Sequence, residues 1–154
     1  RINGVSVANY KIVKTNQFAF NPNDNGPYLP HNFPTNCVAY TGTHDNNTTL
    51  GWLWEAPINE REECLKYCNY DKDNWGDGGS HSGSLRAIMR TLWSSHANVV
   101  IIPVQDALGY GGDTRMNTPG TANGNWMVRF SNEDLASIDN AWFAELNRLY
   151  RRGW

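Results

Sequence analysis

A polar loop at residues 41–49 contains the side chains best suited to chemistry in this chain. Eight of its nine residues carry polar side chains, and the loop directly follows residues 37–40, which are typical of a buried strand. A strand end fixes the backbone of such a loop, which then aims polar groups at a ligand. Asp45 can stabilise positive charge that develops in a cleft, and His44 can donate to a hydroxyl-bearing ligand. The alternatives are that Asp45 caps a helix beginning near Thr48 and that His44 is a hydrogen-bonded structural residue.

A second polar loop, residues 105–126, follows the apolar run at 98–104. The amide of Asn117 can read the hydroxyl groups of a sugar. Trp126 can stack on a sugar ring or brace the loop beside the turn at 119–120. Because the carboxyl ends of parallel strands meet at one edge of a sheet, the two polar loops are expected to face the same cleft.

No motif for a metal, a nucleotide or a serine nucleophile occurs in the sequence. The four His lack the paired spacing of a zinc site, and neither a phosphate loop nor a nucleophile elbow is present. The Asp-rich stretch at 69–81 lacks the ligand order of an EF-hand and is interpreted as a solvated loop. Cys64 and Cys68 share one face of a predicted helix, and with Cys37 they are interpreted as buried thiols. We expect no metal and no cofactor.

The elements that position these loops follow from hydrophobic spacing. The β-branched run at 98–104 predicts a strand buried on both faces. Apolar residues at helical spacing predict a helix over 84–94, capped by Ser82 or Ser84. Further patterns predict weak strands at 5–7 and 10–13, helices at 49–54 and at 59–68 capped by Asn59, and one capped helix from Asn132 to about Arg152. Strands that alternate with helices indicate an α/β fold built from β/α units.

The composition sets limits on the class of protein. A length of 154 residues suits one domain, and a net charge of -2 with a pI of about 6.1 argues against a nucleic-acid partner. No signal-peptide pattern and no apolar run near 18 residues occur, so neither export nor a membrane span is predicted. The high aromatic content of 12% fits core anchors and a ring-stacking surface equally well.

Five ordered blocks resemble the 4-α-glucanotransferases called amylomaltases or disproportionating enzymes, which are relatives of the α-amylases. The blocks are residues 17–20 (QFAF), 27–32 (PYLPHN), 40–46 (YTGTHDN), 103–106 (PVQD), and 115–120 (RMNTPG) with 124–126 (GNW). The resemblance implies a cytoplasmic (β/α)₈ TIM-barrel enzyme that moves α-1,4-glucan segments between maltooligosaccharides with retention. It implies that residues 17–154 are the C-terminal part of this catalytic barrel, with roughly strands six to eight, and that residues 1–16 are a divergent segment.

The resemblance also assigns roles to individual residues. Of the family's three catalytic acids, only the stabilising Asp that follows the seventh strand maps here, as Asp45. His44 and Asn117 carry over as substrate-binding residues. The nucleophile and the acid/base, with the rest of the barrel, are expected upstream of Arg1. Asn47 stands where the family commonly has Asp, which alters hydrogen bonding in the loop and leaves Asp45 in place.

Retaining transfer requires a nucleophile and an acid/base about 5 to 5.5 Å apart. We therefore expect the 154 residues alone to be inactive. Two other functions stay open at this point: a non-catalytic carbohydrate-binding remnant, and an α-glucan hydrolase. The donor and acceptor chain lengths and the oligomeric state do not follow from the sequence.

Overall fold

The computed structural model describes residues 11–14, 19–21, 23 and 26–153. Three strands form a parallel sheet in the order β1-β2-β3, and Val38 in β2 is aligned with Ile12 in β1 and with Val99 in β3. The strands are β1 (Lys11–Lys14), β2 (Cys37–Tyr40) and β3 (Val99–Ile101). The predicted strand at 5–7 and residues 17–18 of the QFAF block lie outside the described residues.

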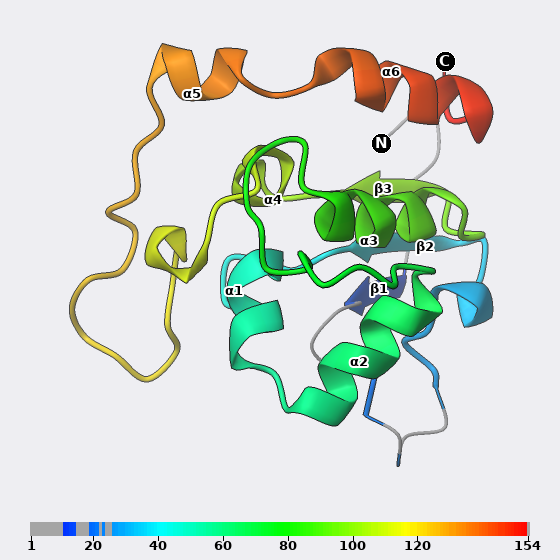
Figure 1. Cartoon of the computed structure of the whole chain (residues 1–154), viewed down its shortest axis with the longest axis horizontal. Helices are drawn as coiled ribbons and strands as arrows, with labels where there is room; N and C mark the ends of the chain where they lie inside the picture. The colour runs from blue at the N-terminus through cyan, green and yellow to red at the C-terminus, as the bar shows by residue number, and fades with distance from the viewer. Residues whose placement is uncertain (1–10, 15–18, 22, 24–25, 154) are drawn as a thin grey trace.

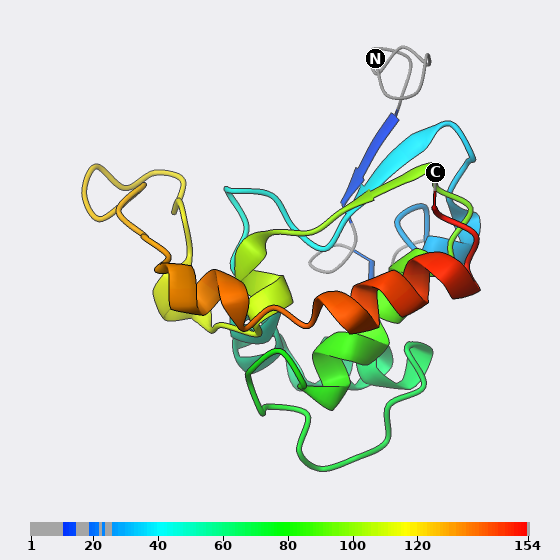
Figure 2. The same cartoon turned by 90° about the horizontal axis from the view of Figure 1, so that it is seen from above.

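Helices lie mainly on one side of this sheet (Figures 1 and 2). They are α1 (Thr49–Glu55), α2 (Ile58–Tyr67), α3 (Gly83–Trp93), α4 (Val104–Leu108), α5 (Asn132–Ala136) and α6 (Asn140–Leu149), with short 3₁₀ turns η2 (Pro30–Asn32) and η3 (Gly112–Thr114). Helix α6 packs along α3. Parallel strands joined through helices confirm the predicted α/β class.

The best-predicted helix is α3. Its N-cap is Ser82, whose side chain accepts a hydrogen bond from the backbone N–H of Leu85. Its buried apolar side chains include Leu85, Ile88, Met89 and Leu92. These four residues recur at three- and four-residue intervals, so they form the face that packs into the core.

The main hydrophobic core lies between α1, α2 and α3. It contains Leu50 and Leu53 from α1, Leu65 from α2 and Ile88 from α3. A smaller cluster beside β2 contains Phe33, Cys37, Ala39, Leu92 and Ala97. Cys64 and Cys68 belong to the main core, and the three Cys are buried thiols, as predicted.

Two predictions on the helices and strands near this core are wrong. Helix α2 begins at Ile58 after Pro57, so Asn59 lies inside the first turn and does not cap the helix. Strand β3 is not buried on both faces, because Val99 and Val100 are only half-buried and Ile101 is 43% exposed. In the described part of the chain β3 pairs with β2 alone and is covered by helices mainly on one side.

The predicted C-terminal helix is two helices. Ser131 and Asp134 form a capping box at the start of α5, and the chain leaves the helix at Ser137. Asp139 then caps α6 by accepting a 3.0 Å hydrogen bond from Trp142 N, while its other oxygen contacts Arg86 of α3 at 2.5 Å. The second cap and the ion pair to α3 stabilise a break that the apolar spacing alone does not reveal.

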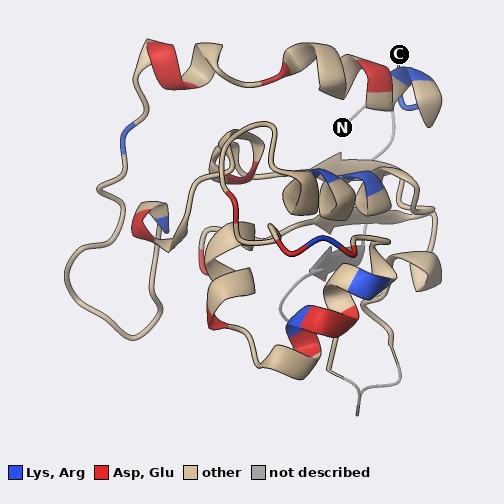
Figure 3. Ribbon diagram, in the orientation of Figure 1, with Lys and Arg blue, Asp and Glu red and all other residues tan. Residues whose placement is uncertain are grey.

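Charged residues of both signs are distributed over the described elements, and they alternate along α2 (Figure 3). The described elements therefore do not group their charged residues by sign. Among the helices that the structure describes, none combines the length and the apolar character needed to span a membrane.

Candidate functional site

The His44–Asp45 pair lies at the tip of a turn between β2 and α1. Asn46 Oδ1 accepts hydrogen bonds from Thr43 N at 2.9 Å and from Thr43 Oγ1 at 3.0 Å, and Asn46 N donates back to Thr43 O at 3.1 Å. Thr48 then caps α1 by accepting from Gly51 N at 3.0 Å. The alternative that Asp45 caps this helix is therefore wrong, because Thr48 has that role.

Asp45 is held through one of its two carboxylate oxygens. Asn117 Nδ2 donates to Asp45 Oδ1 at 2.7 Å, and His44 Nε2 lies 3.3 Å from the same oxygen. The Asp45 and His44 side chains are 44% and 55% exposed. The carboxylate is thus oriented by two neighbours while it remains accessible to a ligand.

The second polar loop docks on the first through its backbone as well. Arg115 donates to the carbonyl oxygen of Asp45 at 2.9 Å and to that of Asn117 at 3.0 Å. Asn117 N donates to His44 O at 3.1 Å. The prediction that the two loops face one cleft is confirmed, and Arg115, for which no role was predicted, joins the two loops.

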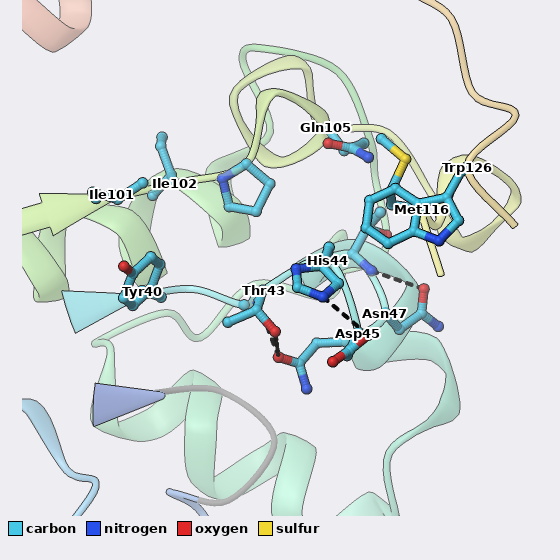
Figure 4. Close-up of a pocket in the computed structure, with 14 residues that line it drawn as sticks. Tyr40, Thr43, His44, Asp45, Asn47, Ile101, Ile102, Gln105, Met116 and Trp126 are labelled. Atoms are coloured by element: carbon cyan, nitrogen blue, oxygen red, sulfur yellow. Dashed lines mark hydrogen bonds and ion pairs between the residues drawn. The ribbon is translucent and has the colours of Figure 1, made fainter. Parts of the chain in front are cut away.

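Trp126 forms one wall of this cleft. Its ring centroid lies 5.1 Å from that of His44, and its backbone N–H donates to Met116 O at 2.8 Å. The backbone therefore braces the loop, while the indole is 56% exposed and borders the pocket. In Figure 4, His44 lies between the Trp126 side and the side formed by Ile101 and Ile102.

The pocket around these residues has a volume of about 590 Å³. Polar side chains of the first loop form its floor, and apolar groups from the end of β3 and from the second loop form its walls. Its lining residues are Tyr40, Gly42, Thr43, His44, Asp45, Asn46, Asn47, Thr48, Ile101, Ile102, Pro103, Gln105, Met116 and Trp126. Apolar surface with a few converging polar groups suits a ligand that has both hydroxyl groups and ring faces.

Asn47 lines this pocket and is buried at its base. Its Oδ1 accepts from Thr48 N at 2.8 Å, so it supports the start of α1. Its amide group packs closely against Gly51 and Gly112, which leaves no room for a Cβ at Gly51. Asn47 therefore joins the first loop to η3 through packing.

Sequence reasoning gave no role to Asp106, the most buried carboxylate near the site. It is only 3% exposed, and it accepts hydrogen bonds from Thr41 Oγ1, Thr49 N and Thr49 Oγ1. Burial raises the pKa of the Asp106 carboxyl, although the hydrogen bonds from Thr41 and Thr49 act in the opposite direction. An acidic residue inside the short apolar segment 104–108 was the signal that could have identified it.

The described residues contain no group of three or more His, Cys, Asp or Glu side chains close enough to hold a metal ion. The groups that converge at and beside the pocket are Asp45, His44, Asn117 and the aromatic ring of Trp126. Such an arrangement can stabilise a cationic transition state and bind hydroxyl groups.

Comparisons with known proteins identify the family of the chain. Residues 4–135 match the family model described as 4-alpha-glucanotransferase. The 4-alpha-glucanotransferase of Clostridium butyricum is 39% identical over 144 residues, which are 90% of this chain and 26% of that protein. The chloroplastic/amyloplastic 4-alpha-glucanotransferase of Solanum tuberosum is 42% identical over 124 residues, which are 80% of this chain and 20% of that protein.

A solved structure of amylomaltase from Streptococcus agalactiae in complex with acarbose is also similar. It superposes with a TM-score of 0.82 at 29% identity and covers 95% of this chain and 28% of that one. The chain thus spans only about a quarter of the length of these relatives. The family that the five sequence blocks suggested is confirmed, and the chain belongs to the 4-alpha-glucanotransferase family.

Proposed function

We propose that the protein carrying this chain is an amylomaltase that transfers α-1,4-glucan segments between maltooligosaccharides with retention. The observation that carries the proposal is the oriented Asp45 carboxylate in a pocket with an aromatic wall. A retaining glycosyl transfer passes through an oxocarbenium-like transition state. A carboxylate fixed beside the reacting carbon stabilises the positive charge of that state, and this is the role we assign to Asp45.

His44 and Asn117 are the proposed substrate-binding residues. Both touch Asp45, so a sugar ring placed against that carboxylate also comes within reach of the imidazole and the amide. Hydrogen bonds from the imidazole and the amide to sugar hydroxyls orient the ring relative to the carboxylate. Trp126 offers an apolar face on which a ring can stack.

We assign β1, β2 and β3 to strands six, seven and eight of a (β/α)₈ barrel. This assignment is supported by the position of Asp45 directly after β2, since the family's stabilising Asp follows the seventh strand. This assignment places residues 11–14 in the barrel together with residues 17–154, so the barrel begins within the segment 1–16 that the sequence resemblance had set apart. The nucleophile and the acid/base are assigned to the part of the barrel that these 154 residues do not include.

Product analysis with maltotriose tests the proposal. The intact protein is expected to convert maltotriose into glucose and into oligosaccharides longer than the substrate. Formation of shorter sugars alone identifies an α-glucan hydrolase and contradicts the proposal. Binding of maltoheptaose without any turnover identifies a carbohydrate-binding remnant. The 154 residues alone are expected to show no transfer, and disproportionation by them would contradict the assignment of the other two acids.

A further inference from the structure

The loop that carries Asp45 begins and ends at two buried threonines. Thr41 directly follows β2, and Thr49 is the first residue of α1. Both side chains are 3% exposed, and each threonine lies four residues from Asp45 along the chain. The position of the Asp45 backbone therefore depends on where these two residues are held.

A single carboxylate binds both of them. Asp106 Oδ1 accepts from Thr49 N at 2.8 Å, and Asp106 Oδ2 accepts from Thr49 Oγ1 at 2.8 Å and from Thr41 Oγ1. The contacts span 65 residues for Thr41 and 57 for Thr49. Because the Thr49 N–H belongs to the first turn of α1, Asp106 also satisfies a backbone donor that α1 leaves without an intrahelical partner.

Asp106 is itself fixed by the strand that precedes it. It lies in the first turn of α4, which follows β3 and has Pro103 as its N-cap. The neighbouring Gln105 donates to Thr114 O at 3.1 Å, which ties α4 to η3. Asp106 thus connects the carboxyl end of β2 to the carboxyl end of β3.

Burying a carboxylate costs free energy, and hydrogen bonds to both of its oxygens reduce that cost. A neutral amide in its place has only one acceptor oxygen and cannot accept from all three groups at once. Between Thr41 and Thr49, the turn at Thr43–Asn46 and the bond from Thr48 N to Asn47 fix the remaining backbone. Asp106 therefore holds the two ends of the loop that carries Asp45, and the contacts from Asn117 and Arg115 orient Asp45 within it.

We propose that Asp106 is a positioning residue for transfer, which places Asp45 by binding Thr41 and Thr49 at the two ends of its loop. The inference rests on the role proposed above for Asp45. Asp106 itself is not among the residues that line the pocket, whereas the adjacent Gln105 is. Loss of the Asp106 contacts is therefore expected to act mainly on the transition state through the placement of Asp45, with a smaller effect on substrate binding through His44 of the same loop.

The test uses matched threonine variants of the intact protein, because valine keeps the shape of threonine and lacks its hydroxyl. The double variant Thr41→Val/Thr49→Val is expected to lower kcat for maltotriose disproportionation about 100-fold with KM within about threefold of the original, as misplacement of a catalytic group predicts. Thr41→Ser/Thr49→Ser keeps both hydroxyls and is expected to restore most of kcat. Each single valine variant is expected to lower kcat about tenfold.

Thr91→Val is the control for hydroxyl loss elsewhere. Thr91 Oγ1 donates to Ala87 O at 2.8 Å within α3, away from the pocket. The inference is overturned if kcat per folded molecule is unchanged in the valine variants, if Thr91→Val lowers kcat equally, or if serine fails to restore it. If the double variant does not fold, the single variants decide between these outcomes.

Asp45→Asn separates this inference from the proposed function. If that variant keeps normal turnover, the role of Asp45 is wrong and the proposed function fails. If Asp45→Asn abolishes turnover while the valine variants transfer normally, only the positioning role of Asp106 is wrong.

Discussion

Asn117 donates a 2.7 Å hydrogen bond to Asp45 Oδ1 across 72 residues of sequence. His44 approaches the same oxygen, and Arg115 holds the Asp45 carbonyl. The carboxylate and its backbone are therefore oriented by two different loops. The Asp45 carboxylate and the Asn117 amide that orients it can therefore be tested by separate substitutions.

Replacing Asp45 by Asn in the intact protein is expected to reduce kcat by at least about 100-fold, because an amide does not stabilise a positive transition state as a carboxylate does. The melting temperature should stay nearly constant, since the side chain is 44% exposed. Asp113→Asn, at an exposed position in η3, is the control. Near-normal turnover by the Asp45 variant would refute the assigned role.

Asn117→Ala removes the donor to Asp45 and a proposed contact to the sugar. We expect kcat to fall about tenfold and KM to rise, because both orientation and substrate binding are weakened. Steady-state kinetics with maltotriose measure both constants. Asn123→Ala, at an exposed position of the same loop, should leave both unchanged. A rise in KM with constant kcat would mean that Asn117 binds substrate without orienting Asp45.

Asp106 and Asp134 should give pH dependences of opposite sign. Burial raises the pKa of Asp106, so its contribution to stability is fully present below the unfolded pKa of about 3.9 and is lost as pH rises through the folded pKa. The Tyr110 hydroxyl and the capping contacts of Ser131 lower the pKa of Asp134, so its contribution is present above the unfolded value and is lost as pH falls through the folded pKa.

Urea unfolding of the original protein, Asp106→Asn and Asp134→Asn over a series of pH values measures both effects. The stability difference between the original protein and Asp106→Asn should shrink as pH rises above about 4, whereas the difference for Asp134→Asn should grow over the acidic range up to that pH. Slopes of the same sign would contradict the environment described for one of the two carboxylates.

Arg152 holds the connection between α3 and β3. Its guanidinium donates to the carbonyls of Trp93 at 2.7 Å, Ala97 at 2.6 Å and Ser95 at 2.7 Å. Arg152→Ala is expected to lower the free energy of unfolding by about 2 kcal/mol, because charge-assisted hydrogen bonds to carbonyls are lost. The exposed neighbour Arg151 provides the matched control, Arg151→Ala, with a loss below about 0.5 kcal/mol. Equal losses of unfolding free energy in the two variants would show that the hydrogen bonds of Arg152 add no stability beyond that of a positive charge at this end of the chain.

Gly109 ends α4 with a φ of +67°, and a Cβ there would lie 2.2 Å from Gly79 O. Gly109→Ala is expected to cost about 3 kcal/mol or more, because both the backbone and the close approach to Gly79 are incompatible with a side chain. Gly120 has a similar φ of +82° with nothing within 4 Å, so Gly120→Ala should cost only about 1 kcal/mol. The urea midpoints of the two variants, each measured against that of the original protein, compare the two losses of stability.

Local patterns in the sequence were sufficient to predict a helix whose formation depends on residues close to one another in the chain. The spacing of Leu85, Ile88 and Met89 predicts α3 because those side chains pack on a single core. The same reasoning fails at Asp139, where a cap and an ion pair to Arg86 divide one predicted helix into two. The partner in α3 lies 53 residues away, and no window of sequence contains both.

In the candidate site, too, local patterns predicted the loops but not the long-range contacts between them. The polar loop at 41–49 and the loop containing Asn117 were both identified from residue types, and their approach followed from the parallel sheet. The bond that orients Asp45 and the three bonds to Asp106 join residues 57 to 72 positions apart. Their geometry depends on how β3 and α4 pack beside β2, which residue types alone do not specify.

Because these contacts join residues far apart in the sequence, one partner of each contact is synthesised well before the other. The chain grows from its N-terminus, so Thr41, Asp45 and Thr49 are made well before Asp106, Arg115 and Asn117 exist. Until those later residues emerge from the ribosome, the His44–Asp45 loop lacks every long-range partner described for it here. The environment of the Asp45 carboxylate is thus completed late, after most of its supporting fold has been translated.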